Sequence, residues 1–493
     1  MRQNSTSPSA VEPKRNSLGQ LNRRDLFKIG LMTLSATAAV AQTVTRTVNG
    51  VLRPHPTNPR YFTDNSGRPV YLTGSHTWAS LQDIGMPPIP RFDWSQYVAM
   101  MTANNHNFIR LWHWSQAAWG AWTPDKILFD PLPYARTGPG TALDGAPKFD
   151  LTSFNPAYFT RLRERVKDAR DQGIYCSVQL FQSFSEHKQW SKYSPWPAHP
   201  YNGANNIQRF DAEKPGTGTV DLARADVREM QARYIKKTVD TVVDLDSVLY
   251  EVINEGGEKD WDWWVVDFVH RYEAGKGVRH PVGLTGFSSE NLEQLLTSPA
   301  DWISPGAKDG SFKTDPPACD GRKVSITDTD HLWGHGGTPA WVWKSFTRGH
   351  NPILMDPWDP IPGGNQRENW TERPGYPGRD VNKRDHWIWD PVRRAMGHSR
   401  TYALKMDLAA ATPRNTLAST GYCLASPGKE YLAYLPEGDE VEMDLSEATR
   451  EFTIEWMHPV EGRTTPGGKV KGGRKETIFV PFPGPAVLYL KAV

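Results

Sequence analysis

Between residues 69 and 411 the sequence alternates eight short apolar runs with segments that have helical spacing of apolar residues. A strand followed by a helix, repeated in this order, is the pattern of parallel α/β proteins. Eight such units predict an α/β fold that closes as a (β/α)8 barrel, with the active site at the C-terminal ends of its strands. The predicted strands are residues 69–74, 107–112, 174–181, 248–253, 281–285, 302–304, 323–328 and 352–356.

The helices between these strands have clear start and stop signals. The strongest is Asn155 before Pro156, an N-cap residue followed by a proline at the first helical position, with Gly173 as the terminator. Asp93 and Thr338 are the predicted caps of two further helices. These signals support the alternation independently of hydrophobicity.

Long segments follow three of the strands, at residues 117–154, 183–220 and 357–384, and we expect them to be irregular. The turns from helix back to strand are short, so the insertions concentrate on the face that carries active sites in barrels. Aromatic rings in these segments are candidate platforms for sugar rings, although each could equally pack beneath a loop. They are Trp119, Trp122, Trp190, Trp196, Trp358 and Trp370.

After residue 413 the pattern changes to short alternating strands separated by turns that are rich in glycine and proline. This pattern predicts a small antiparallel β-sandwich. We therefore expect a barrel domain at residues 52–413 and a second domain at residues 414–493.

The first 41 residues have the features of an export signal rather than of a folded segment. Arg23 and Arg24 precede an apolar run that ends at Ala39-Val40-Ala41, as in a twin-arginine signal with its cleavage site. The run is shorter than the roughly 20 residues that cross a bilayer, so no stable membrane anchor is expected. The prediction is export by the twin-arginine machinery to the periplasm or beyond.

Charge and cysteine content exclude several classes of protein. The formal net charge is only +2, and no long basic run occurs after the signal segment, so nucleic acid is not an expected partner. Three widely spaced cysteines form neither a disulfide framework nor a zinc motif. A metal site made of Asp328, Asp330, His331 and His335 lacks a recognisable ligand spacing. We expect neither metal nor cofactor.

Carboxylates follow two strands on opposite sides of the predicted barrel. Asn254 and Glu255 end the fourth strand, while Asp328 and Asp330 follow the seventh. Burial raises the pKa of a carboxyl group, as a general acid requires, so Glu255 is the candidate acid/base. Two opposed carboxyl groups are typical of glycoside hydrolysis. Arg110, at the end of the second strand, is expected to keep the second carboxylate ionised, and Asn254 to bind the sugar 2-hydroxyl.

Other residues at the strand ends are candidates for sugar binding. His76 and His113 come just after the first and second predicted strands, and either histidine is as easily a structural residue. The full set of candidate substrate-binding residues is Asn254, Arg110, His76, Trp78, His113, Trp114, His331 and Trp358.

These positions resemble the clan of retaining (β/α)8 glycosidases, and more closely an apiosidase-like family of bacterial glycosidases. The matching stretches are residues 58–64 (NPRYFTD), 71–78 (YLTGSHTW), 328–331 (DTDH) and 341–346 (WVWKSF). Residues 431–436 (YLAYLP) and 487–490 (VLYL) resemble a C-terminal domain labelled collagen-binding. The resemblance implies a retaining mechanism with Glu255 as acid/base. The clan usually places a glutamate at the nucleophile position, whereas this chain offers a shorter aspartate. Asp328 is favoured because it follows the strand directly, and Asp330 beside His331 is the alternative. The shorter acid leaves both retention and inversion open.

Two functions stay open at this point. The first is an exported glycoside hydrolase that acts on a polysaccharide or oligosaccharide. The second is a non-catalytic barrel that binds glycan or matrix protein. A binding protein has no need of two opposed carboxyl groups, which favours the hydrolase.

Overall fold

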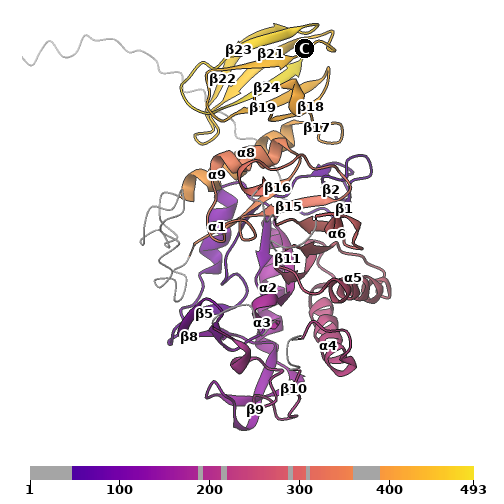
Figure 1. Cartoon of the computed structure of the whole chain (residues 1–493), viewed down its shortest axis with the longest axis vertical. Helices are drawn as coiled ribbons and strands as arrows, with labels where there is room; N and C mark the ends of the chain where they lie inside the picture. Colours follow the sequence, from indigo (N-terminus) through magenta and orange to yellow (C-terminus); the bar gives the residue numbers. More distant parts are fainter. Residues whose placement is uncertain (1–46, 187–192, 213–218, 287–291, 307–310, 359–388) are drawn as a thin grey trace, which may run out of the picture. The chain divides into compact units, whose positions relative to one another are not determined.

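The computed structural model of the chain describes residues 47–186, 193–212, 219–286, 292–306, 311–358 and 389–493 (Figure 1). They belong to one compact unit that spans Arg46–Val493. The signal predicted at residues 1–41 and most of the segment predicted at 357–384 lie outside the described residues.

Eight parallel strands close into a barrel, which confirms the predicted fold class. Each strand pairs with the next in the sequence, and the eighth pairs with the first. All residues of these strands are buried, as expected for strands that helices cover. The strands are β4 (Gly74–His76), β6 (Phe108–Leu111), β11 (Tyr175–Gln182), β12 (Val248–Asn254), β13 (Val282–Thr285), β14 (Trp302–Ser304), β15 (Val324–Asp328) and β16 (Asn351–Met355).

The first barrel strand begins later than the sequence predicts. Pro69–Val70 (β3) pairs antiparallel with Phe62–Thr63 (β2), which in turn pairs with Arg53–Pro54 (β1). The apolar run therefore contributes to two different sheets, and the barrel strand starts only at its last residue. As a result, His76 is the last residue of the strand β4 and does not follow it.

A cluster of apolar side chains fills part of the barrel interior. Its largest member is Trp302, and Gly283 leaves room for the indole ring. A Cβ atom on Gly283 would lie 1.9 Å from the indole of Trp302, which is 1% exposed. The cluster consists of Leu52, Phe62, Leu72, Phe108, Tyr175, Leu249, Trp302, Val324, Ile326 and Ile353. This packed layer supports the polar residues above it.

Three predicted helix N-caps are confirmed. The side chains of Asp93, Asn155 and Thr338 each accept a hydrogen bond from a backbone N–H in the first turn of the helix that follows. The helices are α1 (Trp94–Ala103), α2 (Pro156–Asp171), α3 (Ser183–Glu186), α4 (Ala225–Val242), α5 (Lys259–Ala274), α6 (Leu292–Thr297), α7 (Ser311–Thr314), α8 (Pro339–Thr347) and α9 (Asp390–Lys405), with 3-10 turns η1 (Trp196–Ala198) and η6 (Asn415–Leu417).

The prediction that residues 117–154 are irregular is wrong. They form four strands in two hairpins, the first strand with the second and the third with the fourth, and Pro131 and Pro133 lie in the connection between the hairpins. Gly145, with φ of +89°, lies in the turn that joins the last two strands. The strands are β7 (Ala118–Gly120), β8 (Thr123–Asp130), β9 (Tyr134–Thr141) and β10 (Pro147–Phe154); β8 also pairs with β5 (Asp83–Gly85).

Antiparallel sheets follow the barrel, as predicted, but the sequence did not indicate two of their strands, β17 (Thr412–Pro413) and β22 (Thr464–Lys471). Thr464–Lys471 (β22) contains Pro466 and two glycines, which we interpreted as a turn. It is an edge strand that pairs only with β21, where proline is tolerated. The other strands are β17 (Thr412–Pro413), β18 (Cys423–Ser426), β19 (Glu430–Leu435), β20 (Glu440–Asp444), β21 (Glu451–Met457), β23 (Lys475–Phe479) and β24 (Ala486–Ala492).

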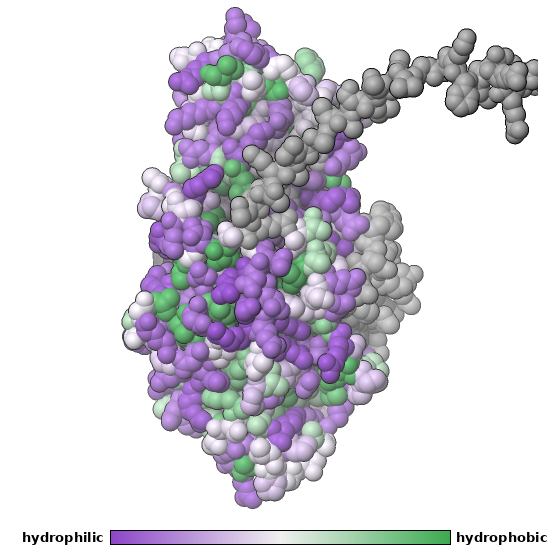
Figure 2. Space-filling model, turned by 180° about the vertical axis from the view of Figure 1, so that it is seen from behind, coloured by the Kyte–Doolittle hydropathy of each residue, from purple (hydrophilic) through white to green (hydrophobic). Residues whose placement is uncertain are grey.

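One apolar cluster joins these sheets to α8 and α9. At its centre the rings of Trp343 and Tyr434 stack with centroids 6.4 Å apart. On the face shown in Figure 2, polar residues predominate and apolar residues form small separate patches. Within the described ranges, no helix has both the length and the apolar character that a membrane span requires.

Candidate active site

A cavity of about 240 Å³ lies at the C-terminal ends of the barrel strands. Its walls come from the ends of β12 and β16, from the segments after β4, β6, β12 and β15, and from two insertions on the same face. In (β/α)8 barrels this is the face that carries the active site. The lining residues are Trp78, Trp112, Trp114, Trp122, Phe184, Asn254, Glu255, Asp330, His331, Leu332, Trp333, Gly334 and Met355.

Glu255 follows β12 directly and lines the cavity beside Asn254. Its backbone has φ of +58°, and Gly256 follows with φ of +77°. Two successive residues in this region turn the chain sharply at the strand end. For a glutamate the conformation costs roughly 1–3 kcal/mol, and such residues cluster at functional sites. Glu255 is only 8% exposed, so its carboxyl group is largely removed from water.

Arg110, in β6, links three segments beneath the cavity. Its guanidinium donates hydrogen bonds to Glu251 at 2.7 and 2.5 Å. It also donates to Asp328 at 2.6 Å and to the side-chain oxygen of Asn254 at 2.7 Å. Burial lowers the pKa of Arg110, but Glu251 and Asp328 outweigh it and raise the pKa above its usual value. The guanidinium is therefore a fixed positive charge that orients Asn254.

The two aspartates predicted at the seventh strand lie in different surroundings. Asp328 ends β15, is fully buried, and is not among the residues that line the cavity. Its carboxylate accepts hydrogen bonds from Arg110 and from His76 Nε2 at 3.0 Å. Asp330 does line the cavity, and its Oδ2 lies 3.6 Å from Arg110 Nη1. Asp330 is therefore the aspartate that shares the cavity with Glu255.

The surroundings shift the pKa values of the two aspartates in opposite directions. Burial raises the pKa of Asp328, but the charges of His76 and Arg110 outweigh burial and bring it below its usual range. Burial and the negative charge of Asp328 raise the pKa of Asp330 to about 8. At neutral pH Asp328 is ionised, whereas Asp330 carries a proton.

Two predicted histidines contact this group. His331 lies between Ser304 Oγ at 2.9 Å and Asn254 Oδ1 at 3.2 Å, and burial lowers its pKa to about 3. His76 stacks on Trp112 with ring centroids 5.4 Å apart, and burial lowers its pKa. Both rings are held by contacts, and His331 is neutral at neutral pH.

Tryptophans form an aromatic wall on one side of the cavity. The ring of Trp78 lies 4.4 Å from that of Trp122 and 5.7 Å from that of Trp114. Trp112 and Trp114 lie 5.8 Å apart. Trp78 and Trp114 are predicted binding residues, and Trp122 is one of the predicted platforms.

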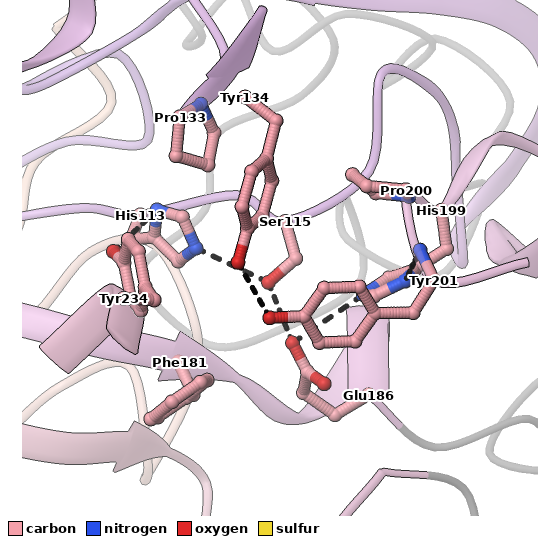
Figure 3. Close-up of a pocket in the computed structure, with 10 residues that line it drawn as sticks. All are labelled: His113, Ser115, Pro133, Tyr134, Phe181, Glu186, His199, Pro200, Tyr201 and Tyr234. Atoms are coloured by element: carbon pink, nitrogen blue, oxygen red, sulfur yellow. Dashed lines mark hydrogen bonds and ion pairs between the residues drawn. The ribbon is translucent and has the colours of Figure 1, made fainter. Parts of the chain in front are cut away.

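The structure does not bring His113 to this cavity. His113 lines a separate cavity of about 20 Å³ instead (Figure 3). Its Nδ1 contacts the Tyr158 hydroxyl at 2.8 Å. In that cavity Glu186 accepts a hydrogen bond from Ser115 at 2.6 Å. A space of this size suits a single water molecule rather than a sugar.

The remaining predicted tryptophans also lie elsewhere. Trp358 is 5% exposed and packs against Tyr97 and the guanidinium of Arg393. Trp196 belongs to the smaller cavity region, stacked on His199, and Trp119 lies near the ammonium of Lys126. The other two, Trp190 and Trp370, lie outside the described residues.

Several residues of the site were missed from the sequence, namely Trp112, Phe184, Glu251, Leu332, Trp333, Gly334 and Met355. Glu251 is fully buried in β12 and pairs with Arg110. A glutamate within an otherwise apolar strand could have indicated this ion pair, because a buried charge needs a partner of opposite charge. Phe184 reaches the cavity from α3, and nothing in its local sequence indicates this.

Within the described part of the chain, no group of three or more histidine, cysteine, aspartate or glutamate side chains is arranged to hold a metal ion. The three cysteines Cys176, Cys319 and Cys423 are free and buried.

Comparison with protein families matches residues 115–289 to a model described as "Domain of unknown function (DUF6298)". The match runs from the segment after β6 to just beyond β13. A search of the curated proteins finds no match. None of these findings names the apiosidase-like family or the collagen-binding domain, so that resemblance stays a prediction.

Solved structures resemble the chain over most of its length. A glycoside hydrolase of family 5 from Bacteroides vulgatus is 13% identical, with a TM-score of 0.58 over 90% of this chain and 94% of the other. A second structure, named only as a glycoside hydrolase, is 10% identical, with a TM-score of 0.57 over 90% of this chain and 98% of the other. These likenesses show that the chain has the (β/α)8 fold of solved glycoside hydrolases.

Proposed function

We propose that this protein is a glycoside hydrolase that cleaves O-glycosidic bonds with Glu255 and Asp330. The observation that carries the proposal is that these two carboxyl groups, both more than nine-tenths buried, line one cavity at the C-terminal end of the barrel. The likeness in fold to solved glycoside hydrolases supports it.

Hydrolysis of a glycoside needs two carboxyl groups on opposite sides of the bond. One gives a proton to the leaving oxygen, and the other attacks the anomeric carbon or activates a water molecule. The proposal leaves Asp328 out of the reaction, because it is fully buried and its carboxylate is already bound by Arg110 and His76. The resemblance to the retaining clan favours attack by a carboxylate and hence retention.

The aromatic wall and Asn254 supply substrate binding. Indole faces suit the apolar faces of sugar rings. Trp78 and Trp122 line the cavity and are partly exposed, while Trp114 packs against both and is only 1% exposed. Arg110 and His331 both contact the side-chain oxygen of Asn254. Its amide nitrogen donates one hydrogen bond to Gln182 Oε1 at 3.4 Å. The second N–H of the amide can donate to a sugar hydroxyl, and we assign that hydroxyl as the 2-hydroxyl.

The proposal is tested by measuring reducing-end release from a panel of pectic, hemicellulosic and bacterial polysaccharides and their fragments. The protein from residue 42 onward is compared with its Glu255→Ala variant. Release that disappears in the variant supports a hydrolase and identifies the substrate class. Binding to a glycan without release, unchanged in the variant, would replace the hydrolase by a non-catalytic binding barrel.

We also propose export through the twin-arginine machinery, on the strength of Arg23, Arg24 and the apolar run that follows them. Replacing both arginines by lysine should retain the full-length chain in the cytoplasm of a bacterial host. Unchanged export of this double variant would contradict the assignment.

A further inference from the structure

The ring of Phe184 reaches the cavity from α3, a helix of only four residues that starts directly after the third barrel strand, β11. A helix this short is not stable by itself and takes its conformation from tertiary contacts. The position of the Phe184 ring in the cavity therefore depends on the side chains that hold α3 in place.

Glu186, the last residue of α3, is bound to three separate segments of the chain. Its carboxylate accepts hydrogen bonds from the hydroxyl of Ser115, at 2.6 Å, and from the hydroxyl of Thr219. His199 Nε2 lies 3.5 Å from the same carboxylate (Figure 3). The backbone N–H of Thr219 also donates to the carbonyl oxygen of Glu186 at 3.2 Å. Glu186 thus joins both ends and the middle of the insertion at residues 183–220 to the segment after β6.

Burial makes these contacts strong. Glu186 is 2% exposed, and burial by itself raises the pKa of its carboxyl group. The nearby charge of His199 and the hydrogen bonds from Ser115 and Thr219 outweigh burial and bring the pKa below its usual value. Glu186 is therefore ionised at neutral pH, and hydrogen bonds to an ionised acceptor are roughly twice as strong as those between neutral groups.

Further contacts link α3 to the catalytic residues. Ser185 donates a hydrogen bond to the side-chain oxygen of Gln116. The backbone N–H of Phe184 donates to Gln182 Oε1 at 3.3 Å, and the same oxygen accepts a hydrogen bond from Asn254 Nδ2 at 3.4 Å. A displacement of α3 would therefore move the ring of Phe184 and disturb the amide of Asn254.

We propose that Glu186 is a positioning residue for substrate binding: through Ser115 and Thr219 it fixes α3 and so holds the ring of Phe184 against the bound sugar. Glu186 itself is not among the residues that line the large cavity. The role rests on the proposed hydrolase function, because it assigns Phe184 to the substrate-binding surface of that site.

Kinetics on the substrate found in the polysaccharide panel test this role. Glu186→Gln keeps the shape of the side chain but removes its charge and one acceptor oxygen, and it should raise KM about tenfold with kcat changed much less. Thr219→Val removes one donor to Glu186 and should raise KM about threefold. Phe184→Ala should raise KM about tenfold. An unchanged KM in Glu186→Gln, or a loss in kcat alone, would overturn the proposal.

The double variant of Phe184→Ala with Glu186→Gln separates positioning from general stability. If Glu186 acts through the ring of Phe184, the double variant should have the KM of Phe184→Ala alone, because the two residues share one effect. Effects that multiply to about 100-fold would show that the two residues act independently, which contradicts the proposal.

Glu273→Gln is the matched control. Glu273 is also a fully buried glutamate bound to a histidine, with His280 Nδ1 at 2.7 Å, but it lies in α5 and does not line the cavity. This variant should keep the KM of wild type. A rise in KM equal to that of Glu186→Gln would show that loss of any buried glutamate has the same effect, and the proposal would fail.

A further measurement needs no substrate and separates this proposal from the hydrolase proposal. With 4-fluorophenylalanine incorporated at position 184, the fluorine NMR signal should be displaced or broadened by Glu186→Gln and by Thr219→Val, and unchanged by Glu273→Gln. A signal that both substitutions leave unchanged would overturn the positioning role even if the protein hydrolyses a glycan. Should Glu186→Gln fail to fold, Thr219→Val alone decides the result.

Discussion

The guanidinium of Arg110 and the carboxylate of Glu251 form a bidentate ion pair in the barrel interior, with hydrogen bonds of 2.7 and 2.5 Å. Their side chains are 2% and 0% exposed. Two parallel hydrogen bonds fix the plane of the guanidinium as well as its position. The remaining guanidinium donors are therefore aimed at Asp328 and Asn254, and the arrangement of the site depends on this pair.

Removal of one partner should reveal how much the barrel depends on the pair. Glu251→Ala leaves the buried charge of Arg110 only partly compensated and should lower the free energy of unfolding by about 3–5 kcal/mol. Urea denaturation measures this. The control is Asp244→Ala, which breaks an exposed ion pair with Arg163 and should cost at most about 1 kcal/mol. Equal losses in the two variants would contradict the account.

The raised pKa of Asp330 predicts a pH-dependent cost to stability. An unfolded aspartate loses its proton near pH 3.9, whereas folded Asp330 keeps it up to about pH 8. Between these values the folded chain binds one more proton than the unfolded chain, so the stability contributed by this group falls as pH rises. The lowered pKa of Asp328 changes the stability only at pH values below this range.

Asp330→Asn removes this cost. The melting temperature of the variant relative to wild type should rise steadily between about pH 5 and pH 8 and level off above that. Scanning calorimetry at several pH values measures the difference. A difference that stays constant with pH would show that Asp330 titrates normally.

The aromatic wall should contribute to substrate affinity. Trp122→Ala removes a partly exposed ring from the cavity and should raise KM about tenfold, equivalent to about 1.4 kcal/mol, with a smaller effect on kcat. Trp263→Ala is a matched control, because Trp263 is a partly exposed tryptophan of α5 near Lys259 and does not line the cavity. Steady-state kinetics that show equal changes in both variants would argue against a binding role.

The packed layer beneath the site should not tolerate a larger residue at Gly283. A Cβ atom there would lie 1.9 Å from the ring of Trp302, so Gly283→Ala should destabilise the fold by about 1–3 kcal/mol through overpacking. Gly275→Ala is the control, since its Cβ would meet its nearest neighbour at 3.4 Å. Thermal unfolding should separate the two variants clearly.

Much of the barrel could be predicted because its signals are local. Apolar runs and caps such as Asn155 and Thr338 locate strands and helices, and Asn254-Glu255-Gly256 indicates a polar strand end. Local patterns do not reveal which way a side chain points after a strand ends. The sequence therefore favoured Asp328, which follows the strand directly, and kept Asp330 only as the alternative.

The placement of His113 shows a signal that was available but unused. Alternate residues of a strand point to opposite sides, and Arg110, Trp112 and Trp114 all face the inside of the barrel or the cavity. His113, between two of them, must face outward, and it does so toward Tyr158. The hairpins within residues 117–154 carry no comparable signal, because most residues of β8, β9 and β10 are not buried.

The most direct test of the central claim is kcat/KM for hydrolysis of the substrate found in the polysaccharide panel, measured for wild type, Glu255→Gln and Asp330→Asn, with folding of each variant verified by circular dichroism. The account predicts that each substitution lowers kcat/KM by at least about 100-fold while the fold is retained. Wild-type rates in either folded variant would show that the two carboxyl groups of the cavity do not carry the reaction.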